Sequence, residues 1–541
     1  MSNMPKNIID MHIHVFNARY LPVKGATRQY IGDALAGALA TIMNSITRSF
    51  FHETEEDDWA VCEYLQAREA ERQPADYAEA LWILVENQIR KRARRQKNMF
   101  SSMSRAKRER FASRELERDP LLNALEALFT AVGEKYPALA GAVDGRLRGK
   151  IVDDIFSVKP GALALLAAKK LFLSTLNAIS DTLQKAQAFG DSVHDYLEFF
   201  YTMTRDEKSM LTKIRTEYRS DRPMRLFVHY MMDMKYGCEP VDDPYYSFFP
   251  QQCENMLQLA AASGGALLGF SAFHPRRSDW REIADKSLRM GFVGFKFYPS
   301  MGFLPIGNDD PVVEKNVEDF LLYCIERNVP VVAHCTPCGF QAVKGSGVRA
   351  DPRHWKKRLE TPGFEKLRLN LCHAGGGEQT NMEAQVTSKG WYAGDGEWEG
   401  DGNYARTVAE LCGKYKNVYC DVSYLLELYE KGGAADSVRE RFERNLEREL
   451  FKNGFAKKII FGSDWNMPQI IAETDAYLDY YLTLFSKPAF NQYRDDFFWK
   501  NALAFLDLEG YLKRLNDIAE RPEVLAYAGA VRLKYELLIG S

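Results

Sequence analysis

Eight short apolar runs separated by helix-like segments predict an α/β protein, a (β/α)8 TIM barrel with a large all-helical insertion between strand 1 and strand 2. The runs are mostly continuous and rich in Val, Ile and Phe, as expected for strands that are covered on both faces of a parallel sheet. From the second run to the eighth, successive starts lie 26 to 50 residues apart, which leaves room for a helix in each gap. The eight runs are Ile8–Val15, Arg225–Met232, Ala266–Phe273, Phe292–Tyr298, Val329–Cys335, Leu367–Cys372, Asn417–Val422 and Lys458–Gly462.

The insertion is predicted because about 210 residues separate the first run from the second, far more than a βα loop contains. Its apolar residues recur at helical spacing, for example at Leu121, Leu125 and Leu128. We therefore expect two domains, a TIM-barrel catalytic domain formed by residues 1–16 and 225–541 and a helical insertion over 17–224. Because βα loops leave a barrel at its C-terminal face, the insertion is expected to form a cap over the mouth or an oligomer contact.

Composition describes a globular protein with a large core. The chain has 541 residues, of which 46% are hydrophobic and 27% charged, and this excludes a disordered or fibrous protein. A net charge of −3 gives no overall attraction to nucleic acid or to an anionic membrane. The first residues lack a signal-peptide pattern, and no apolar run is long enough to span a bilayer. Nine scattered cysteines do not suggest a disulfide framework, so we expect a cytoplasmic protein.

Histidines mark the first strand as chemically unusual. The chain has only nine histidines, and six of them lie in or just after predicted strands. In Asp10-Met11-His12-Ile13-His14, a period of two places Asp10, His12 and His14 on one face of an otherwise apolar strand. Two imidazoles near the C-terminal end of one strand can converge on a single ion, although two hydrogen-bonded structural histidines would give the same pattern.

Three further polar residues end predicted strands. His334 ends the fifth, His373 the sixth and Asp464 the eighth. In a barrel these strand ends meet around one mouth. The imidazoles of His334 and His373 and the carboxylate of Asp464 are therefore expected to lie near the imidazoles of the first strand. Such ligands suit Zn²⁺, with Mn²⁺ or Fe²⁺ as candidates when a carboxylate is present.

The same residues carry a resemblance to a known family. The motifs DMHIH, VVAHC, NLCHAGG and FGSDWNMP, followed by KNALAFLDL, resemble the amidohydrolase-related family of metal-dependent TIM-barrel enzymes, the amidohydrolase superfamily. The match covers residues 1–16 and about 225–515, in the order in which the family has these motifs.

The resemblance implies a metal held by His12, His14, His334 and Asp464. In the family, the residue that matches His373 either completes the site or acts as a base near it, and the aspartate of strand eight often also shuttles a proton. We therefore predict Asp464 and His373 as the catalytic residues and one divalent ion, Zn²⁺ or alternatively Mn²⁺, as the cofactor.

The family resemblance predicts the residues of the site but leaves two types of reaction open. Its members include hydrolases of C–N and C–O bonds and also nonoxidative decarboxylases. We expect a hydrolase that uses a metal-activated water on an amide, lactone or ester of a small molecule. The alternative is a decarboxylase of an aromatic or unsaturated acid. Arg276 and Arg277, which follow strand three, could bind the carboxylate of such a substrate. Some decarboxylase relatives replace the first histidine of the pair with glutamate, so His12 slightly favours hydrolysis.

Three residues beside the proposed ligands are predicted to contact substrate, namely Lys296, Tyr298 and Trp465. Lys296 ends strand four, where binuclear relatives place a carboxylated lysine between two metals. We favour a single ion, with Lys296 as a cation that contacts substrate or a neighbouring carboxylate. His229 and His274 are interpreted as structural, because the ligand set is complete without them.

Partners are expected to be few. Residues 90–118 contain twelve basic and three acidic residues, a possible nucleic-acid face, but a solvated helix pair facing the acidic run at 53–58 is the more common explanation. Cys335 and Cys338 form a CxxC motif without a thioredoxin-like unit around it, so we do not assign it a redox role. We expect a small-molecule substrate, no nucleic acid or membrane, and, from the resemblance, a homodimer.

Overall fold

A parallel eight-stranded sheet forms the centre of the protein and contains all eight predicted strands. The computed structural model describes residues 4–48, 55–70, 76–100, 119–136, 162–185, 192–429, 433–452, 454–467 and 473–540. The strands follow the order β1-β2-β3-β4-β5-β6-β9-β10, and every neighbouring pair is parallel. They are β1 (Ile8–Ile13), β2 (Met224–Tyr230), β3 (Leu267–Phe273), β4 (Gly294–Phe297), β5 (Val331–Ala333), β6 (Leu369–Leu371), β9 (Val418–Asp421) and β10 (Ile459–Ile460).

The last strand returns to the first, so the sheet is a nearly closed barrel. The chain that follows β10 runs parallel to β1, where Met11 N donates to the carbonyl of Phe461 over 3.1 Å and Asp464 N donates to the carbonyl of His12 over 2.7 Å. A parallel bridge joins Ile13 to Trp465. The TIM-barrel fold predicted from the sequence is confirmed.

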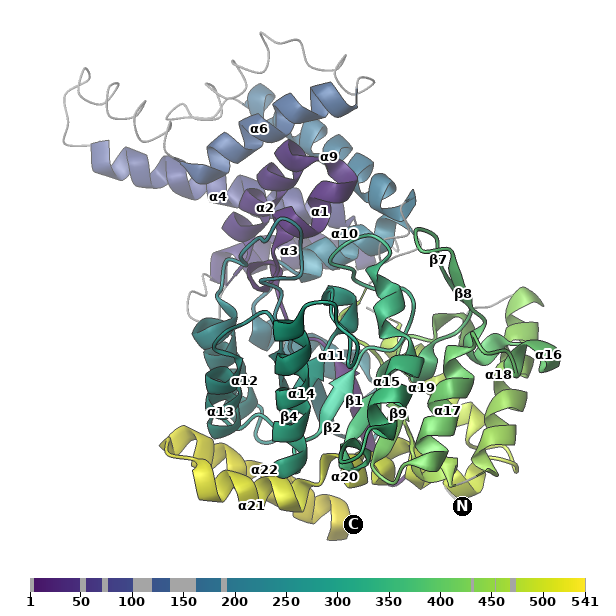
Figure 1. Ribbon diagram of the computed structural model, residues 1–541. Helices are drawn as coiled ribbons and strands as arrows, with labels where there is room; N and C mark the ends of the chain where they lie inside the picture. The colour runs from purple at the N-terminus through teal and green to yellow at the C-terminus, as the bar shows by residue number, and fades with distance from the viewer. Residues whose placement is uncertain are drawn as a thin grey trace. The chain divides into compact units, whose positions relative to one another are not determined.

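Helices surround the strands (Figure 1). Their sequences explain where they begin: before α14, Asp310 accepts hydrogen bonds from the backbone N–H groups of Val312 and Val313, and Pro311 occupies the first helical position. The apolar face of α14 is then buried in the core. The helices of this layer include α12 (Cys253–Ala262), α13 (Trp280–Arg289), α14 (Pro311–Glu326), α15 (Pro352–Glu360), α17 (Tyr404–Lys414), α18 (Gly433–Leu450) and α19 (Thr474–Leu484).

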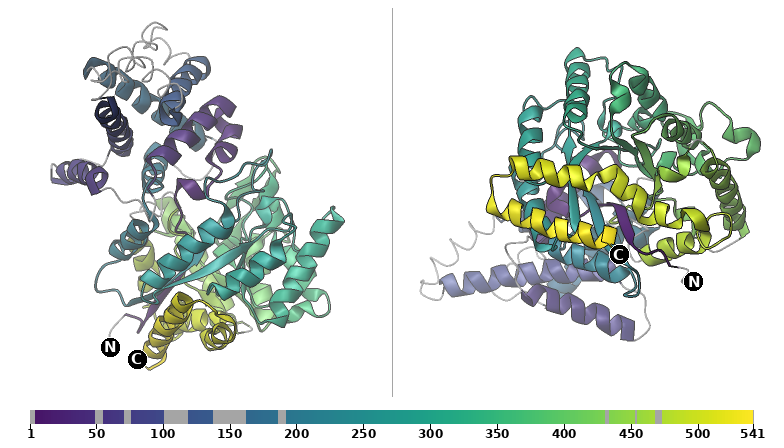
Figure 2. Two further views of the ribbon diagram at one scale, coloured as in Figure 1. Left: turned by 90° about the vertical axis from the view of Figure 1, so that its left-hand side faces the viewer. Right: turned by 90° about the horizontal axis from the view of Figure 1, so that it is seen from below.

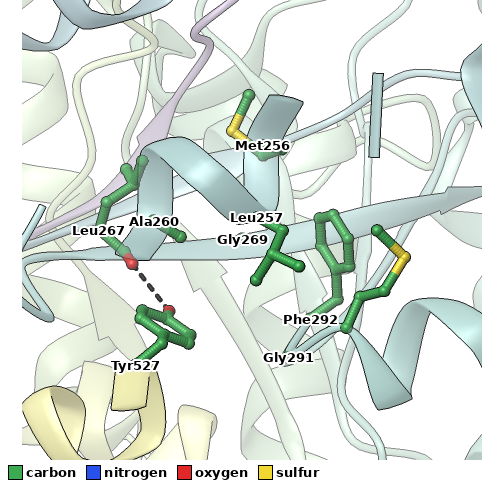
Figure 3. Close-up of a pocket in the computed structure, with 9 residues that line it drawn as sticks. Met256, Leu257, Ala260, Leu267, Gly269, Gly291, Phe292 and Tyr527 are labelled. Atoms are coloured by element: carbon green, nitrogen blue, oxygen red, sulfur yellow. Dashed lines mark hydrogen bonds between the residues drawn. The ribbon is translucent and has the colours of Figure 1, made fainter. Parts of the chain in front are cut away.

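The C-terminal helices α20 (Asn501–Leu506), α21 (Leu508–Ile518) and α22 (Pro522–Gly540) lie at the end of the barrel where the chain enters β1 (Figure 2). Phe505 of α20 stacks on Phe270 of β3 with ring centroids 6.4 Å apart. A pocket between α12, β3 and α22 is lined almost entirely by apolar groups, and there Tyr527 donates to the carbonyl of Leu267 over 2.8 Å (Figure 3). None of the predicted site residues lines this pocket.

Among its described residues, the segment between β1 and β2 contains helices joined by turns and no β-strand, as predicted for an all-helical insertion. It contains α1 (Val23–Ile31), α2 (Asp33–Ile46), α3 (Glu55–Ala70), α4 (Tyr77–Phe100), α6 (Pro120–Lys135), α9 (Ala162–Lys185), α10 (Val193–Thr202) and α11 (Glu207–Glu217). Two compact units can be distinguished. One comprises 1–15, 211–241 and 246–541, and the other comprises 16–210 and 242–245.

The charged stretches of the insertion lie largely outside the described residues. At the edge of the basic stretch, Arg90 pairs with Glu86, and Arg92 lies 2.7 Å from Asp119. The side chains of the acidic run at 53–58 are not among those described. Among the helices that the structure describes, none combines the length and the apolar character that crossing a membrane requires.

Candidate metal centre

Three of the predicted ligands meet at the C-terminal end of the barrel. His12 and His14 come from the end of β1, and Asp464 follows β10 by four residues. The two Nε2 atoms are 3.2 Å apart, and Asp464 Oδ1 lies 3.1 Å from that of His12 and 3.2 Å from that of His14. All three side chains are buried. They form a group that could hold a metal ion.

Hydrogen-bond directions show that this group fits a cation. His14 Nδ1 lies 2.8 Å from the carbonyl of Tyr230, which can only accept, so Nδ1 carries the proton and Nε2 a lone pair. His12 Nδ1 lies 3.2 Å from the Asp421 carboxylate, which gives His12 the same tautomer. Two lone pairs therefore face Asp464 Oδ1, which accepts no hydrogen bond from the described residues.

The spacing also suits a metal. Ligands bonded to one Zn²⁺ at about 2.0–2.1 Å in tetrahedral geometry lie roughly 3.3 Å apart, close to the 3.1–3.2 Å separations of these three atoms. A cation among these three buried acceptor atoms would compensate for the cost of removing them from water. The residues present thus fit the divalent ion that the family resemblance implies.

Electrostatics keeps the imidazoles in the form that binds metals. Burial lowers the pKa of His12 well below its usual range, and the nearby charge of Lys296 lowers it further. The same two causes lower the pKa of His334 to about 3. Burial raises the pKa of Asp464, against the influence of His14, which lowers it. Neutral imidazoles with available lone pairs result.

His334 and His373 form a second pair beside the first. His334 Nδ1 lies 3.0 Å from His373 Nε2, and His334 Nε2 lies 2.9 Å from the carbonyl of Cys338. His373 in turn contacts His12, with ring centroids 5.1 Å apart. His334 is therefore one imidazole away from the group of His12, His14 and Asp464, and its role as a ligand stays a prediction.

Unusual backbone conformations coincide with the site. His373, Ala374 and Asp464 have positive φ angles of 62°, 49° and 70°, in the left-handed region that non-glycine residues rarely adopt. Such residues cost on the order of 1–3 kcal/mol each and cluster at functional sites. The strand ends of β6 and β10 are thus held in conformations that the surrounding structure must impose.

The three predicted substrate contacts lie in different surroundings. Lys296 is buried, donates from Nζ to Cys372 Sγ over 3.2 Å and lies 4.9 Å from the centre of the Tyr230 ring. Tyr298 stacks on His334 with centroids 4.5 Å apart. Trp465 is fully buried and donates from its indole nitrogen to Glu217 over 2.8 Å. Their contact with substrate stays a prediction.

Asp10 differs from what its position in the strand suggested. Although it shares the face of His12 and His14 in a regular strand, it is absent from the candidate metal group. Its carboxylate instead accepts hydrogen bonds from Tyr218 over 2.7 Å and from Ser463, over 3.0 Å from N and 2.7 Å from Oγ. The pairing of β1 with β2 shifts register after Asp10, which breaks the period of two.

Sequence reasoning missed two residues that support the histidines. Asp421 ends β9, and Ser423 follows it by two positions. Both contact His12 Nδ1, with Asp421 Oδ1 3.2 Å and Ser423 Oγ 2.9 Å away. The signal was available, because Asp421 ends the predicted seventh strand just as the proposed ligands end theirs.

The remaining candidates have structural surroundings. His229 accepts a hydrogen bond from the backbone N–H of Val15 over 2.8 Å, and His274 accepts one from Arg276 over 3.3 Å. Burial lowers the pKa of both to about 3. Cys335 and Cys338 are both free thiols, the former buried.

Part of the chain is similar to known proteins. A family model described as Amidohydrolase matches residues 250–508. No curated protein matches the sequence. Solved structures that match include a probable 2-pyrone-4,6-dicarboxylic acid hydrolase from Acinetobacter baumannii with citric acid bound, at 14% identity, covering 56% of this chain and 88% of that one with a TM-score of 0.36.

Two further matching structures were solved with metals. An amidohydrolase from Burkholderia multivorans with bound zinc is 12% identical and covers 57% of this chain and 91% of its own, with a TM-score of 0.35. A mutant 5-carboxyvanillate decarboxylase from Novosphingobium aromaticivorans with bound manganese is also 12% identical. The match covers 61% of this chain and 93% of that one, with a TM-score of 0.31.

Proposed function

Residues 250–508 of this chain belong to the amidohydrolase family, and from that premise we propose that the protein is a metal-dependent hydrolase of a C–N or C–O bond in a small molecule. One observation carries the proposal: Nε2 of His12, Nε2 of His14 and Oδ1 of Asp464 converge, with 3.1–3.2 Å between each pair of atoms. We propose that these residues hold one divalent ion, Zn²⁺ or alternatively Mn²⁺, and that His334 completes the set.

Such an ion would supply Lewis-acid chemistry, by lowering the pKa of water toward about 7 and polarising a carbonyl group. In this proposal Asp464 takes the proton from the attacking water and passes it to the leaving group. Burial supports this role because it raises the pKa of Asp464 and makes its carboxylate a stronger base. His373 offers a second base, since its Nδ1 faces the carbonyl of Ser423 and its Nε2 is left with a lone pair.

Substrate would lie against Tyr298 and Lys296. Tyr298 is held by stacking on His334, so its ring position is coupled to that of a proposed ligand. Lys296 places a buried ammonium group close to His12 and Asp464, where it could balance negative charge that develops on a substrate oxygen.

A nonoxidative decarboxylase is the second candidate, and the surroundings of Lys296 favour it. Its ammonium group donates a hydrogen bond to the Cys372 thiol, a weak acceptor. A substrate carboxylate would be a much better partner for a buried cation. In that reaction the carboxylate leaves as CO₂ and a protein acid protonates the carbon, so no water acts as nucleophile.

A product assay on the metal-loaded enzyme distinguishes the two reactions. We would screen lactones, amides and aromatic acids, measuring acid release and CO₂ release in parallel. Acid without CO₂ supports the hydrolase, and CO₂ supports the decarboxylase. His12→Ala and Asp464→Asn should each lose metal and activity together, and full activity in a metal-depleted variant with both changes would refute both reactions.

A further inference from the structure

One hydroxyl group connects a proposed ligand with a proposed base. Ser423 Oγ lies 2.9 Å from Nδ1 of His12 and 2.9 Å from Nδ1 of His373. It also lies 2.5 Å from Asp421 Oδ1. Ser423 and Asp421 are both fully buried, so solvent does not compete for these contacts.

The direction of each hydrogen bond follows from the donors and acceptors present. A serine hydroxyl has one proton and two lone pairs, and a carboxylate only accepts, so Ser423 donates its proton to Asp421. Both lone pairs of Oγ then accept N–H groups, one from His12 Nδ1 and one from His373 Nδ1. The carbonyl of Ser423, 3.2 Å from His373 Nδ1, requires the same tautomer of His373.

Protonation of Nδ1 leaves a lone pair on Nε2, at the opposite side of each ring. With Nδ1 protonated, His12 presents the lone pair of Nε2 to His14 and Asp464, and His373 presents that of Nε2 to His334. If Asp421 could not accept, the hydroxyl could turn and donate to one imidazole. That ring would then carry its proton on Nε2, where it would block the lone pair.

We propose that Asp421 and Ser423 are positioning residues that fix the tautomers of His12 and His373. Asp421 acts on His373 through the hydroxyl of Ser423, and on His12 both directly and through that hydroxyl. The proposal rests on the proposed function, in which His12 binds the metal. Asp421 is itself held firmly, because its other oxygen accepts from Asn370 Nδ2 over 2.6 Å and its Oδ1 accepts from the backbone N–H of His373 over 3.2 Å.

The test measures metal affinity of the full chain, stripped of metal and titrated with Zn²⁺ against a chelating dye. Ser423→Ala and Asp421→Asn should each weaken affinity by about 10- to 100-fold, as loss of a group that orients a ligand typically does. Ser423→Thr keeps the hydroxyl and should restore most of the affinity. Because Asp421 and Ser423 share a hydrogen bond and both contact His12, the loss in the double variant should be smaller than the sum of the two single losses.

Ser271→Ala is the matched control, since Ser271 in β3 is also a fully buried serine but bonds to Ser287 instead of a histidine. Its affinity should equal that of the wild type. If Ser423→Ala does not fold, the tautomers can be measured from the ¹⁵N resonances of histidine in metal-free Ser423→Thr and Asp421→Asn. Ser423→Thr should keep the rings of His12 and His373 protonated at Nδ1, and Asp421→Asn should not.

Unchanged Zn²⁺ affinity in both single variants, or additive losses in the double variant, would overturn the proposal. A wild-type protein that binds no metal would instead refute the proposed function, so the two failures are distinguishable. Wild-type tautomers in Asp421→Asn would equally contradict the role of Asp421.

Discussion

Gly462 lies where the first and last strands of the barrel come closest, directly before the segment that carries Asp464. A Cβ atom at this position would be 2.9 Å from Cβ of His12 and 3.3 Å from its backbone nitrogen. Neither atom belongs to the flexible end of a side chain, so the two strands would have to separate. The absence of a side chain at Gly462 therefore allows His12 and Asp464 to approach each other.

We predict that Gly462→Ala destabilises the protein by about 1–3 kcal/mol, as overpacking typically does, and weakens metal binding. Chemical denaturation and dye competition measure the two effects. Gly529→Ala is the control, because a Cβ there meets nothing within 4 Å and the residue lies in helix α22. It should be neutral or stabilising by up to about 1 kcal/mol, and a Gly462→Ala variant as stable as this control would contradict the account.

At the scale of single residues, the sequence pointed to the proposed ligands more readily than to the residues that contact them. His12, His14 and Asp464 could be found because polar residues at the ends of apolar strands stand out and because barrel strands end at one mouth. Asp421 and Ser423 act through contacts with β1 and with the segment after β6, and a single sequence does not reveal which side chains they reach. Asp10 was misplaced because a register shift interrupts the regular alternation of β1.

Among the elements, β1 is joined to the segment after β10 through Asp10, whose carboxylate accepts hydrogen bonds from Ser463. Burial raises the pKa of Asp10 to about 6, although hydrogen bonds from Ser463 and Tyr218 lower it in part. The unfolded value is about 3.9. Since the folded pKa is the higher one, the folded state binds the proton more tightly, and the stability contributed by this group falls as pH rises from about 4 through 6.

We therefore predict that the wild type loses about 1 kcal/mol of stability relative to Asp10→Asn between pH 5 and pH 7. Urea denaturation of both proteins at each pH measures this difference. An opposite slope, with the wild type gaining on the variant as pH rises, would show that the carboxylate is stabilised in its charged form.

The eight strands were predictable because each is a continuous apolar run, although most are shorter than the run. The hairpin of β7 (Gln379–Asn381) and β8 (Val386–Ser388) was not predicted. Its strands have three residues each and lie in a glycine-rich segment, so neither length nor apolar pattern marks them. They are specified by pairing with each other instead of by burial in the barrel.

For the whole molecule, the two compact units should respond differently to metal. A ligand that binds only the folded state stabilises the part that it contacts by about 4 kcal/mol at a thousand times its Kd. Every proposed ligand lies in the unit of residues 1–15, 211–241 and 246–541. We predict that removing metal increases hydrogen exchange in β1 and around His373 and Asp464 and leaves α2, α6 and α9 unchanged. Equal increases in both units, measured by mass spectrometry, would contradict a local site.

The metal content of the purified protein tests the central claim most directly. Wild type, His14→Ala and His354→Ala would be prepared side by side without chelator or nickel affinity resin and analysed by inductively coupled plasma mass spectrometry. We expect about one equivalent of Zn or Mn in the wild type and in His354→Ala, whose histidine lies in α15, and none in His14→Ala. A wild type that neither contains metal nor takes it up, or a His14→Ala variant that keeps a full equivalent, would contradict the account.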